Sequence, residues 1–161
     1  MAATLALLAL LLGGVAPEPA TAWMVPEYLG LSLGMTPAAA RAALEGEGLE
    51  AREGKEAGHL IVEIEARRTI TLVFADDRLQ SIRFELIGFL HEIPKAFHEI
   101  ETALEERCGE PSRRAEDPPL LVFDARPPAV YVVGSTDRKT PFGKQGLGFL
   151  VVRYFDPPAE R

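Results

Sequence analysis

The chain of 161 residues has little of what small proteins commonly use for crosslinking or metal binding. Cys108 is its only cysteine, so an intramolecular disulfide cannot form and stability must come from a hydrophobic core. Its three histidines, His59, His91 and His98, lack the i, i+4 spacing of a helical zinc site. The sequence therefore predicts no metal site and no bound cofactor.

Residues typical of catalysis are also scarce. Serine occurs only four times, and none lies in the Gly-x-Ser-x-Gly elbow of a hydrolase. The glycine-rich segment 143–148 lacks the spacing of a phosphate-binding loop. The adjacent carboxylates Asp76 and Asp77 fall where a turn between two strands is expected, and turn formation accounts for them. These patterns favour neither a hydrolase nor a nucleotide enzyme.

Basic residues are fewer than acidic ones, with 17 lysines and arginines against 24 aspartates and glutamates, which gives a formal net charge of -7 at pH 7. Nucleic acids and anionic lipid surfaces are bound by clustered lysine and arginine, so an acidic chain of this kind is not expected to bind either.

Only one long apolar run is present, at residues 5–12, and Ala20-Thr21-Ala22 follows it as a small-residue motif. This order is typical of a secretory signal peptide over residues 1–22, which would leave a single domain over residues 23–161. The apolar stretch is shorter than the roughly 20 residues needed to cross a membrane, and no cysteine follows it for lipidation. We therefore expect a periplasmic or secreted protein with no membrane insertion after cleavage.

The periodicity of the first half predicts one helix and three strands. Thr36 and Pro37 form a helix start ahead of residues 38–45. Alternating apolar residues then predict strands over residues 59–65, 69–74 and 79–86, joined by short turns as an antiparallel meander.

The second half has the same order of elements. Helical spacing predicts a helix over residues 94–108, and apolar runs predict strands over residues 120–123, 130–133 and 147–155. The tripeptide Ala103-Leu104-Glu105 repeats Ala43-Leu44-Glu45 at an offset of 60. We therefore expect an α+β fold with short helices packed on one face of an antiparallel β-sheet. Two degenerate α-β-β-β repeats and a chance match both remain open.

Residues 134–146 form an unusually long connection between two predicted strands. The segment contains Arg138, Lys139 and Lys144 with Phe142 among them, on an otherwise acidic chain. These four residues are the candidate protein-binding site, since a basic patch with an aromatic anchor suits an acidic partner. A solvated connection that simply keeps the protein soluble is the alternative.

Two segments carry a resemblance to known families. The first is Leu33-Gly34-Met35-Thr36-Pro37 followed by a short helix and the hairpin Phe74-Ala75-Asp76-Asp77-Arg78-Leu79, and the second is the helix end at residues 103–111. Together they resemble the outer-membrane assembly lipoproteins of the SmpA/OmlA type and the β-lactamase inhibitor proteins. The resemblance implies short helices on an antiparallel sheet, and proteins that bind other proteins without performing chemistry.

The expected function is an exported, non-catalytic binding or assembly module of the cell envelope, with another envelope protein as its partner. The alternative is a small envelope enzyme or ligand carrier whose site is assembled only in three dimensions, for example from Arg67, Arg83 and Glu85 on neighbouring strands. A structural protein with no tight partner is the third interpretation.

Overall fold

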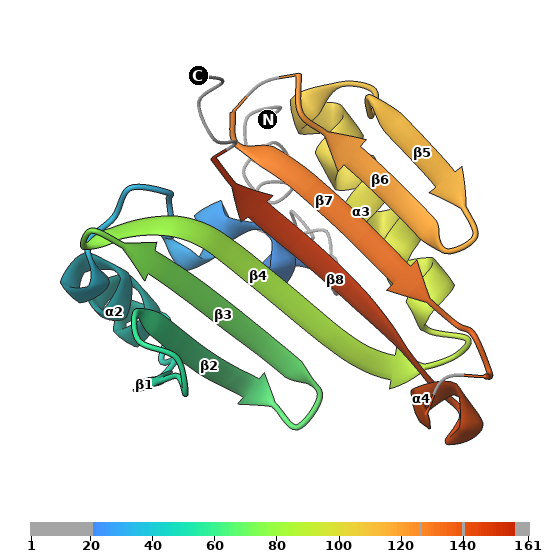
Figure 1. Cartoon of the computed structure of the whole chain (residues 1–161), viewed down its shortest axis with the longest axis horizontal. Coiled ribbons are helices and arrows are strands. Elements are labelled where there is room, and N and C mark those ends of the chain that lie inside the picture. Colours follow the sequence, from blue (N-terminus) through green and yellow to red (C-terminus); the bar gives the residue numbers. More distant parts are fainter. Residues whose placement is uncertain (1–20, 126, 140, 157–161) are drawn as a thin grey trace, which may run out of the picture.

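The computed structural model describes residues 21–125, 127–139 and 141–156, so most of the predicted signal peptide lies outside the described residues. The described chain forms one antiparallel sheet of eight strands together with short helices (Figure 1), which confirms the predicted α+β class. The strand order is β1-β2-β3-β4-β8-β7-β6-β5. Each half of the chain thus builds one half of the sheet, and the two halves join where β4 pairs with β8.

The elements follow one another along the chain in two similar series. The helices are η1 (Ala22–Met24), η2 (Pro26–Leu29), α2 (Pro37–Gly46), α3 (Ile93–Cys108) and α4 (Pro141–Lys144). The strands are β1 (Ala51–Glu53), β2 (His59–Glu65), β3 (Arg68–Ala75), β4 (Arg78–Phe89), β5 (Arg113–Glu116), β6 (Pro119–Phe123), β7 (Ala129–Ser135) and β8 (Leu147–Phe155). No helix of the described residues has the length and apolar character needed to cross a membrane.

The predicted local signals of the first half are confirmed. Helix α2 begins where the Thr36 hydroxyl accepts a hydrogen bond from the Ala39 amide at 3.3 Å. The turn between β3 and β4 places both Asp76 and Asp77 at positive φ, 50° and 55°. Two consecutive left-handed residues give the tight hairpin turn that matches the twist of the flanking strands.

Helix α3 is confirmed, and it begins at Ile93, one residue earlier than predicted. Its buried residues are Ile93, Ala96, Ile100 and Leu104, whereas Phe97 and Cys108 are only half-buried.

Strands β1 and β5 are absent from the prediction because they are short and carry charged residues. They form the two outer edges of the sheet, and each edge is tied to a helix by an arginine. Arg41 of α2 donates to the Ala51 carbonyl of β1 at 2.6 Å. Arg114 of β5 pairs with Glu101 and Glu105 of α3, and the hydrogen bond that Arg114 donates to the Glu101 carboxylate raises the pKa of Arg114.

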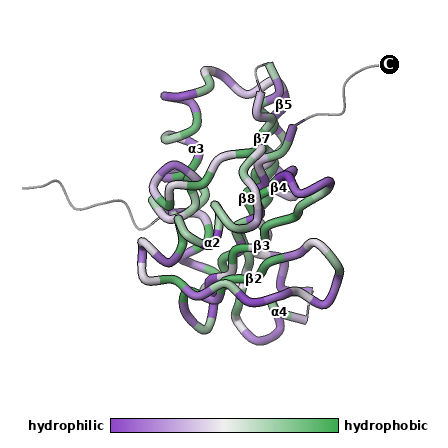
Figure 2. The backbone as a smooth tube through the Cα atoms, turned by 90° about the vertical axis from the view of Figure 1, so that its left-hand side faces the viewer, coloured by the Kyte–Doolittle hydropathy of each residue, from purple (hydrophilic) through white to green (hydrophobic). Residues whose placement is uncertain are grey.

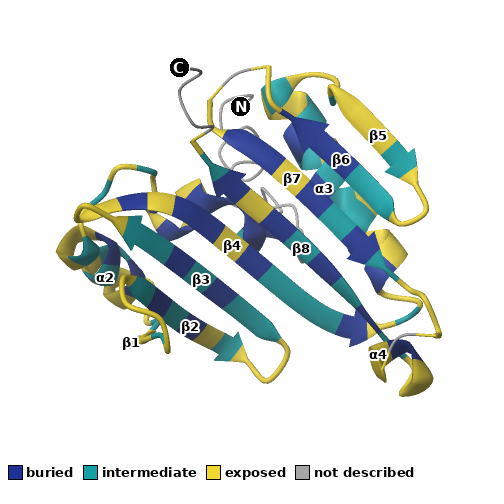
Figure 3. Ribbon diagram, in the orientation of Figure 1, coloured by how far each residue is buried: buried dark blue, intermediate teal, exposed yellow. Residues whose placement is uncertain are grey.

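The core lies on one face of the sheet, where alternate residues of every long strand are buried (Figure 3). We call this the core face. Apolar segments concentrate along the strands in Figure 2, and the turns are mostly hydrophilic.

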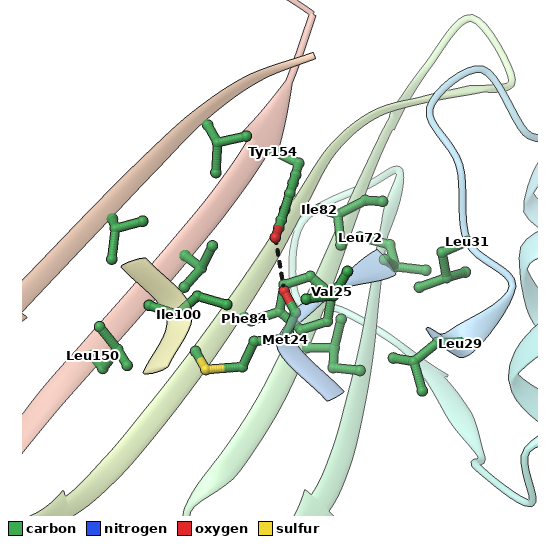
Figure 4. Packing of buried hydrophobic residues seen from close by; sticks show 14 of the residues in the cluster. Met24, Val25, Leu29, Leu31, Leu72, Ile82, Phe84, Ile100, Leu150 and Tyr154 are labelled. Carbon is green, nitrogen blue, oxygen red and sulfur yellow. Dashed lines mark hydrogen bonds between the residues drawn. The ribbon is translucent and has the colours of Figure 1, made fainter. Parts of the chain in front are cut away.

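The segment 21–31 is part of this core (Figure 4). Met24 is fully buried, and its carbonyl accepts a hydrogen bond from the hydroxyl of Tyr154 at 3.1 Å. Phe84 lies between Trp23 and Tyr154 with edge-on rings, each pair of centroids 5.9 Å apart. Burial raises the pKa of Tyr154 above its ordinary value. The N-terminal segment therefore fills the centre of the core through contacts with β4 and β8.

Candidate functional site

The face of the sheet opposite the core face carries one continuous row of side chains. The strand register aligns one residue from each strand, and side-chain alternation places all of them on this opposite face. We call these residues the cross-sheet row: Arg52, Ile61, Thr71, Arg83, Arg153, Tyr131, Val122 and Arg113. Their neighbours along the strands, such as Phe84 and Val152, lie fully buried on the core face.

A hollow of about 670 Å³ lies over the middle of this row. Its lining comes from strands β2, β3, β4, β7 and β8, with the turn residues 54–56 forming one wall. A second hollow of about 510 Å³ lies toward β5. Tyr131 and Val133 line both, so the two hollows adjoin and together extend from β2 to β5.

Arg83 and Arg153 form the centre of the row, directly opposite each other on β4 and β8. Like charges in this position repel, because their Cβ atoms are only about 5 Å apart in a paired sheet. Arg83 is partly compensated by Glu85, whose carboxylate lies 2.7 Å from its guanidinium. Arg153 donates from Nε to the Ser81 hydroxyl at 3.0 Å and makes no ion pair with a carboxylate among the described residues.

Tyr131 is the main aromatic side chain beside this pair. It stands opposite Arg153 in the register and is 39% exposed, a high value for a large apolar ring in mid-strand. Its ring packs against Phe155 with centroids 4.9 Å apart, and the Arg153 guanidinium lies 5.3 Å from the Phe155 ring. Stacked arginine and aromatic groups with exposed surface are typical of binding sites in protein interfaces.

Arg67, Arg83 and Glu85, the example given above of a site assembled in three dimensions, do not all come together. Arg83 and Glu85 are paired, but Arg67 lies at the turn between β2 and β3 with its guanidinium 4.7 Å from the centre of the Phe89 ring. The hollow over the row includes Arg83 and neither of the other two residues in its lining.

The residues of the predicted loop site lie at one end of β7 and β8. Arg138 and Lys139 are exposed in the connection, and Phe142 and Lys144 belong to α4, where Phe142 is 44% exposed. None of the four lines either hollow of the cross-sheet row. The loop and the row are therefore two separate candidate regions.

The loop is held by close backbone packing. A Cβ atom at Gly143 would lie 2.0 Å from the Asp137 carbonyl oxygen, so only glycine fits there. The carboxylate of Asp137 accepts a hydrogen bond from the Lys139 amide at 2.8 Å, and the Gly146 carbonyl accepts one from Leu90 at 3.2 Å. These bonds tie the loop to itself and to the turn after β4.

Carboxylates and histidines do not gather into a metal site within the described ranges of the chain. His59 is half-buried, with Nε2 lying 3.5 Å from Glu56, and His98 lies 3.4 Å from Glu101 on α3. Each of these histidines has one carboxylate neighbour, which is too few ligands for zinc.

Sequence reasoning missed Arg153 and Tyr131. The signal that marks them is a polar or aromatic residue at alternate positions of an otherwise apolar strand, as in Arg153 and Phe155 of β8. Their meeting with Arg83 depends on the pairing of β4 with β8, which no local pattern specifies.

Comparison of the chain with protein-family models, with curated proteins and with solved structures found no match. The function is therefore inferred from the geometry of the sheet face.

Proposed function

We propose that this protein is an exported, non-catalytic binding or assembly module of the cell envelope, which binds a partner protein on the sheet face that carries the cross-sheet row. One observation carries the proposal: two adjoining hollows extend across the sheet around an exposed tyrosine and an arginine pair. Interfaces between proteins are centred on such aromatic and arginine residues.

The proposal requires that the short helices pack on the core face only. The buried residues of α2 and α3 belong to the same hydrophobic cluster as the buried residues of the strands, which supports this arrangement. Helix α3 contacts β7 and β8, and the hollows on the opposite face have no residue of α2 or α3 in their lining.

We also propose that the two halves are degenerate repeats, each now with four strands. The offset of 60 between Leu44 and Leu104 recurs between Thr71 and Tyr131, which occupy equivalent places beside Arg83 and Arg153. Arg153 follows Arg83 by 70 residues, and the longer connection between β7 and β8 accounts for most of the difference. In this interpretation the arginine pair lies on the pseudo-twofold axis of the sheet.

A small envelope enzyme or ligand carrier is the second candidate, and the geometry supports it less. Small-molecule sites enclose most of their ligand, whereas the hollow over the row has the sheet as its floor and only residues 54–56 as a wall outside the strands. The proposed binding role agrees with the resemblance to the SmpA/OmlA lipoproteins and the β-lactamase inhibitor proteins, which act by binding other proteins. The residues Arg138, Lys139, Phe142 and Lys144 remain a second candidate contact region.

Export is proposed from the sequence of residues 1–22, and the cleavage position bears on the fold. Thr21 and Ala22 are buried, and the Thr21 hydroxyl lies 3.4 Å from the Glu99 carboxylate. Cleavage after Ala22 would remove these contacts and keep the bond from Tyr154 to Met24. Amino-terminal sequencing of the exported protein measures where the cut is made, and recovery of an uncut chain in the cytoplasm would contradict export.

Affinity capture from the envelope fraction tests the binding role. We expect the wild-type protein to retain a stoichiometric partner in mild salt and the Tyr131→Ala variant to lose it. Tyr28→Ala is the matched control, because Tyr28 is 54% exposed on η2 and lines neither hollow of the row. Failure to recover any partner, or equal retention by Tyr131→Ala, would refute the proposal.

A further inference from the structure

We infer that Arg83 and Arg153 together bind a carboxylate, and that the carboxylate is an acidic side chain of the partner protein. The inference rests on the proposed binding function and adds the chemistry of its central contact. It depends on three features of the pair: its position, its unused hydrogen-bond donors and its charge surroundings.

The position of the pair is unfavourable for the isolated protein. Two arginines directly opposite each other repel. An oppositely charged or apolar residue in place of one arginine would stabilise the folded sheet better. In this register Arg83 faces Arg153 at the seam of the two halves, with Thr71 and Tyr131 on either side. A bound anion between the two guanidinium groups would turn this repulsion into attraction.

Both guanidinium groups keep donors available. Arg153 uses Nε for the Ser81 hydroxyl, and its two terminal nitrogens have no hydrogen-bond partner among the described residues. Arg83 uses Nη2 for Glu85, and its Nη1 likewise has no partner in the described part of the chain. A guanidinium offers paired N–H groups that fit a carboxylate with two parallel hydrogen bonds.

The surroundings of the pair select an anion. The lining of the hollow contains three cationic side chains, Lys55, Arg83 and Arg153, and one carboxylate, Glu56. With the Glu85 carboxylate, which lies 2.7 Å from Arg83, the cations remain in excess on a protein whose net charge is -7. The apolar side chains Ile61, Val73, Val133 and Val151 also line the hollow. An apolar lining lowers the local dielectric constant once a partner excludes water, which strengthens a charge pair.

The shape favours a carboxylate carried by a protein over a free small acid. The hollow adjoins a second hollow through Tyr131 and Val133, so the surface around the pair extends to β5. A small acid would cover only the arginine pair, whereas a protein segment would also cover the exposed ring of Tyr131.

Selection of phage-displayed random peptides on the full chain tests this inference. We expect the wild-type protein to enrich peptides that carry Asp or Glu among apolar residues. For a selected peptide, the double variant Arg83→Gln/Arg153→Gln should weaken binding by roughly tenfold or more, the effect of losing hydrogen bonds to a charged group. Exchanging the peptide's Glu for Gln should weaken binding to wild type equally and should cost nothing further on the double variant.

The matched control is Arg78→Gln/Lys95→Gln, which removes the same charge at two exposed residues that line neither hollow. This variant should bind the selected peptides as wild type does. Thermal unfolding should show Arg83→Gln/Arg153→Gln to be at least as stable as wild type, because the variant removes the repulsion between the two charges, so a loss of binding would not come from unfolding.

Each other outcome overturns a different statement. Enriched peptides without acidic residues, or an equal loss in the Arg78→Gln/Lys95→Gln control, overturn the arginine pair and leave the binding module intact. N-acetylglutamate that binds as tightly as the peptide overturns the assignment to a partner protein. No enrichment on wild type, together with no partner in the capture experiment, overturns the proposed function and the arginine pair with it.

Discussion

Replacing Tyr154 by Phe removes one oxygen atom from the centre of the core. The hydroxyl donates to the Met24 carbonyl at 3.1 Å, and both residues are buried, so water cannot replace the lost bond. A buried carbonyl left without its donor costs about 1–3 kcal/mol. We therefore expect Tyr154→Phe to lower the free energy of unfolding at pH 7 by this amount.

The difference between the two proteins should shrink in alkali. Burial raises the pKa of Tyr154 in the folded protein, whereas the same side chain in the unfolded chain ionises near its ordinary value of 10.0. Above that pH only the unfolded state loses the proton, so the stability of wild type falls with rising pH. One pH unit above the unfolded pKa the loss is about 1.4 kcal/mol, and Tyr154→Phe lacks it. At pH 11 the difference should therefore lie between about 1.6 kcal/mol in favour of wild type and about 0.4 kcal/mol in favour of the variant.

Urea unfolding between pH 7 and pH 11 measures both effects. Fluorescence of Trp23, the single tryptophan, reports the N-terminal segment, because its ring packs edge-on against Phe84. Circular dichroism reports the sheet. Tyr28→Phe is the control, since Tyr28 is exposed and its removal should change neither quantity. An unfolding free energy of Tyr154→Phe equal to that of wild type at pH 7, or a gap that stays constant to pH 11, would refute the reasoning.

Three further predictions concern the core, the arginine pair and the loop. Leu104→Ala should lower the unfolding free energy by about 2–5 kcal/mol in urea titrations, because Leu104 is fully buried on α3. Leu147→Ala should lower it clearly less, because Leu147 is only half-buried. Equal losses in the two variants would contradict the core described. A double-mutant cycle of Arg83→Gln and Arg153→Gln should give a repulsive coupling of about 0.2–1 kcal/mol that shrinks in 1 M salt; zero coupling at low salt would show that the groups do not repel. Gly143→Ala should speed amide hydrogen exchange in residues 136–146, because its Cβ would lie 2.0 Å from the Asp137 oxygen; Gly46→Ala, whose Cβ meets no atom within 4 Å, should leave exchange unchanged.

The parts of the fold that sequence predicts are those with strong local signals. The cap at Thr36, the double turn at Asp76 and Asp77, and the alternation along β2 to β4 each determine a local geometry by themselves. Strands β1 and β5 escape this kind of prediction because three or four mostly charged residues show no alternation. Their extended conformation comes from pairing with β2 and β6, which is a tertiary effect.

The site was less predictable than the fold. The sequence groups Arg83 with Arg67 and Glu85, which neighbour it in sequence or strand order. Arg153, the partner of Arg83, lies 70 residues further along the chain, and the two meet only through the register of β4 and β8. A slip of one residue in that register would move one arginine to the core face. Local patterns do not contain this information.

The contacts that Arg41 makes with β1 and that Arg114 makes with α3 affect how the protein behaves at high concentration. An open sheet ends in unpaired backbone groups on which another chain can add as a new strand. Here the outer strands are short and charged, the Ala51 carbonyl is already bonded to Arg41, and Arg114 holds β5 to α3. Sideways growth into filaments is thereby disfavoured, and the sheet can display a broad face at high concentration without recruiting copies of itself along its edges.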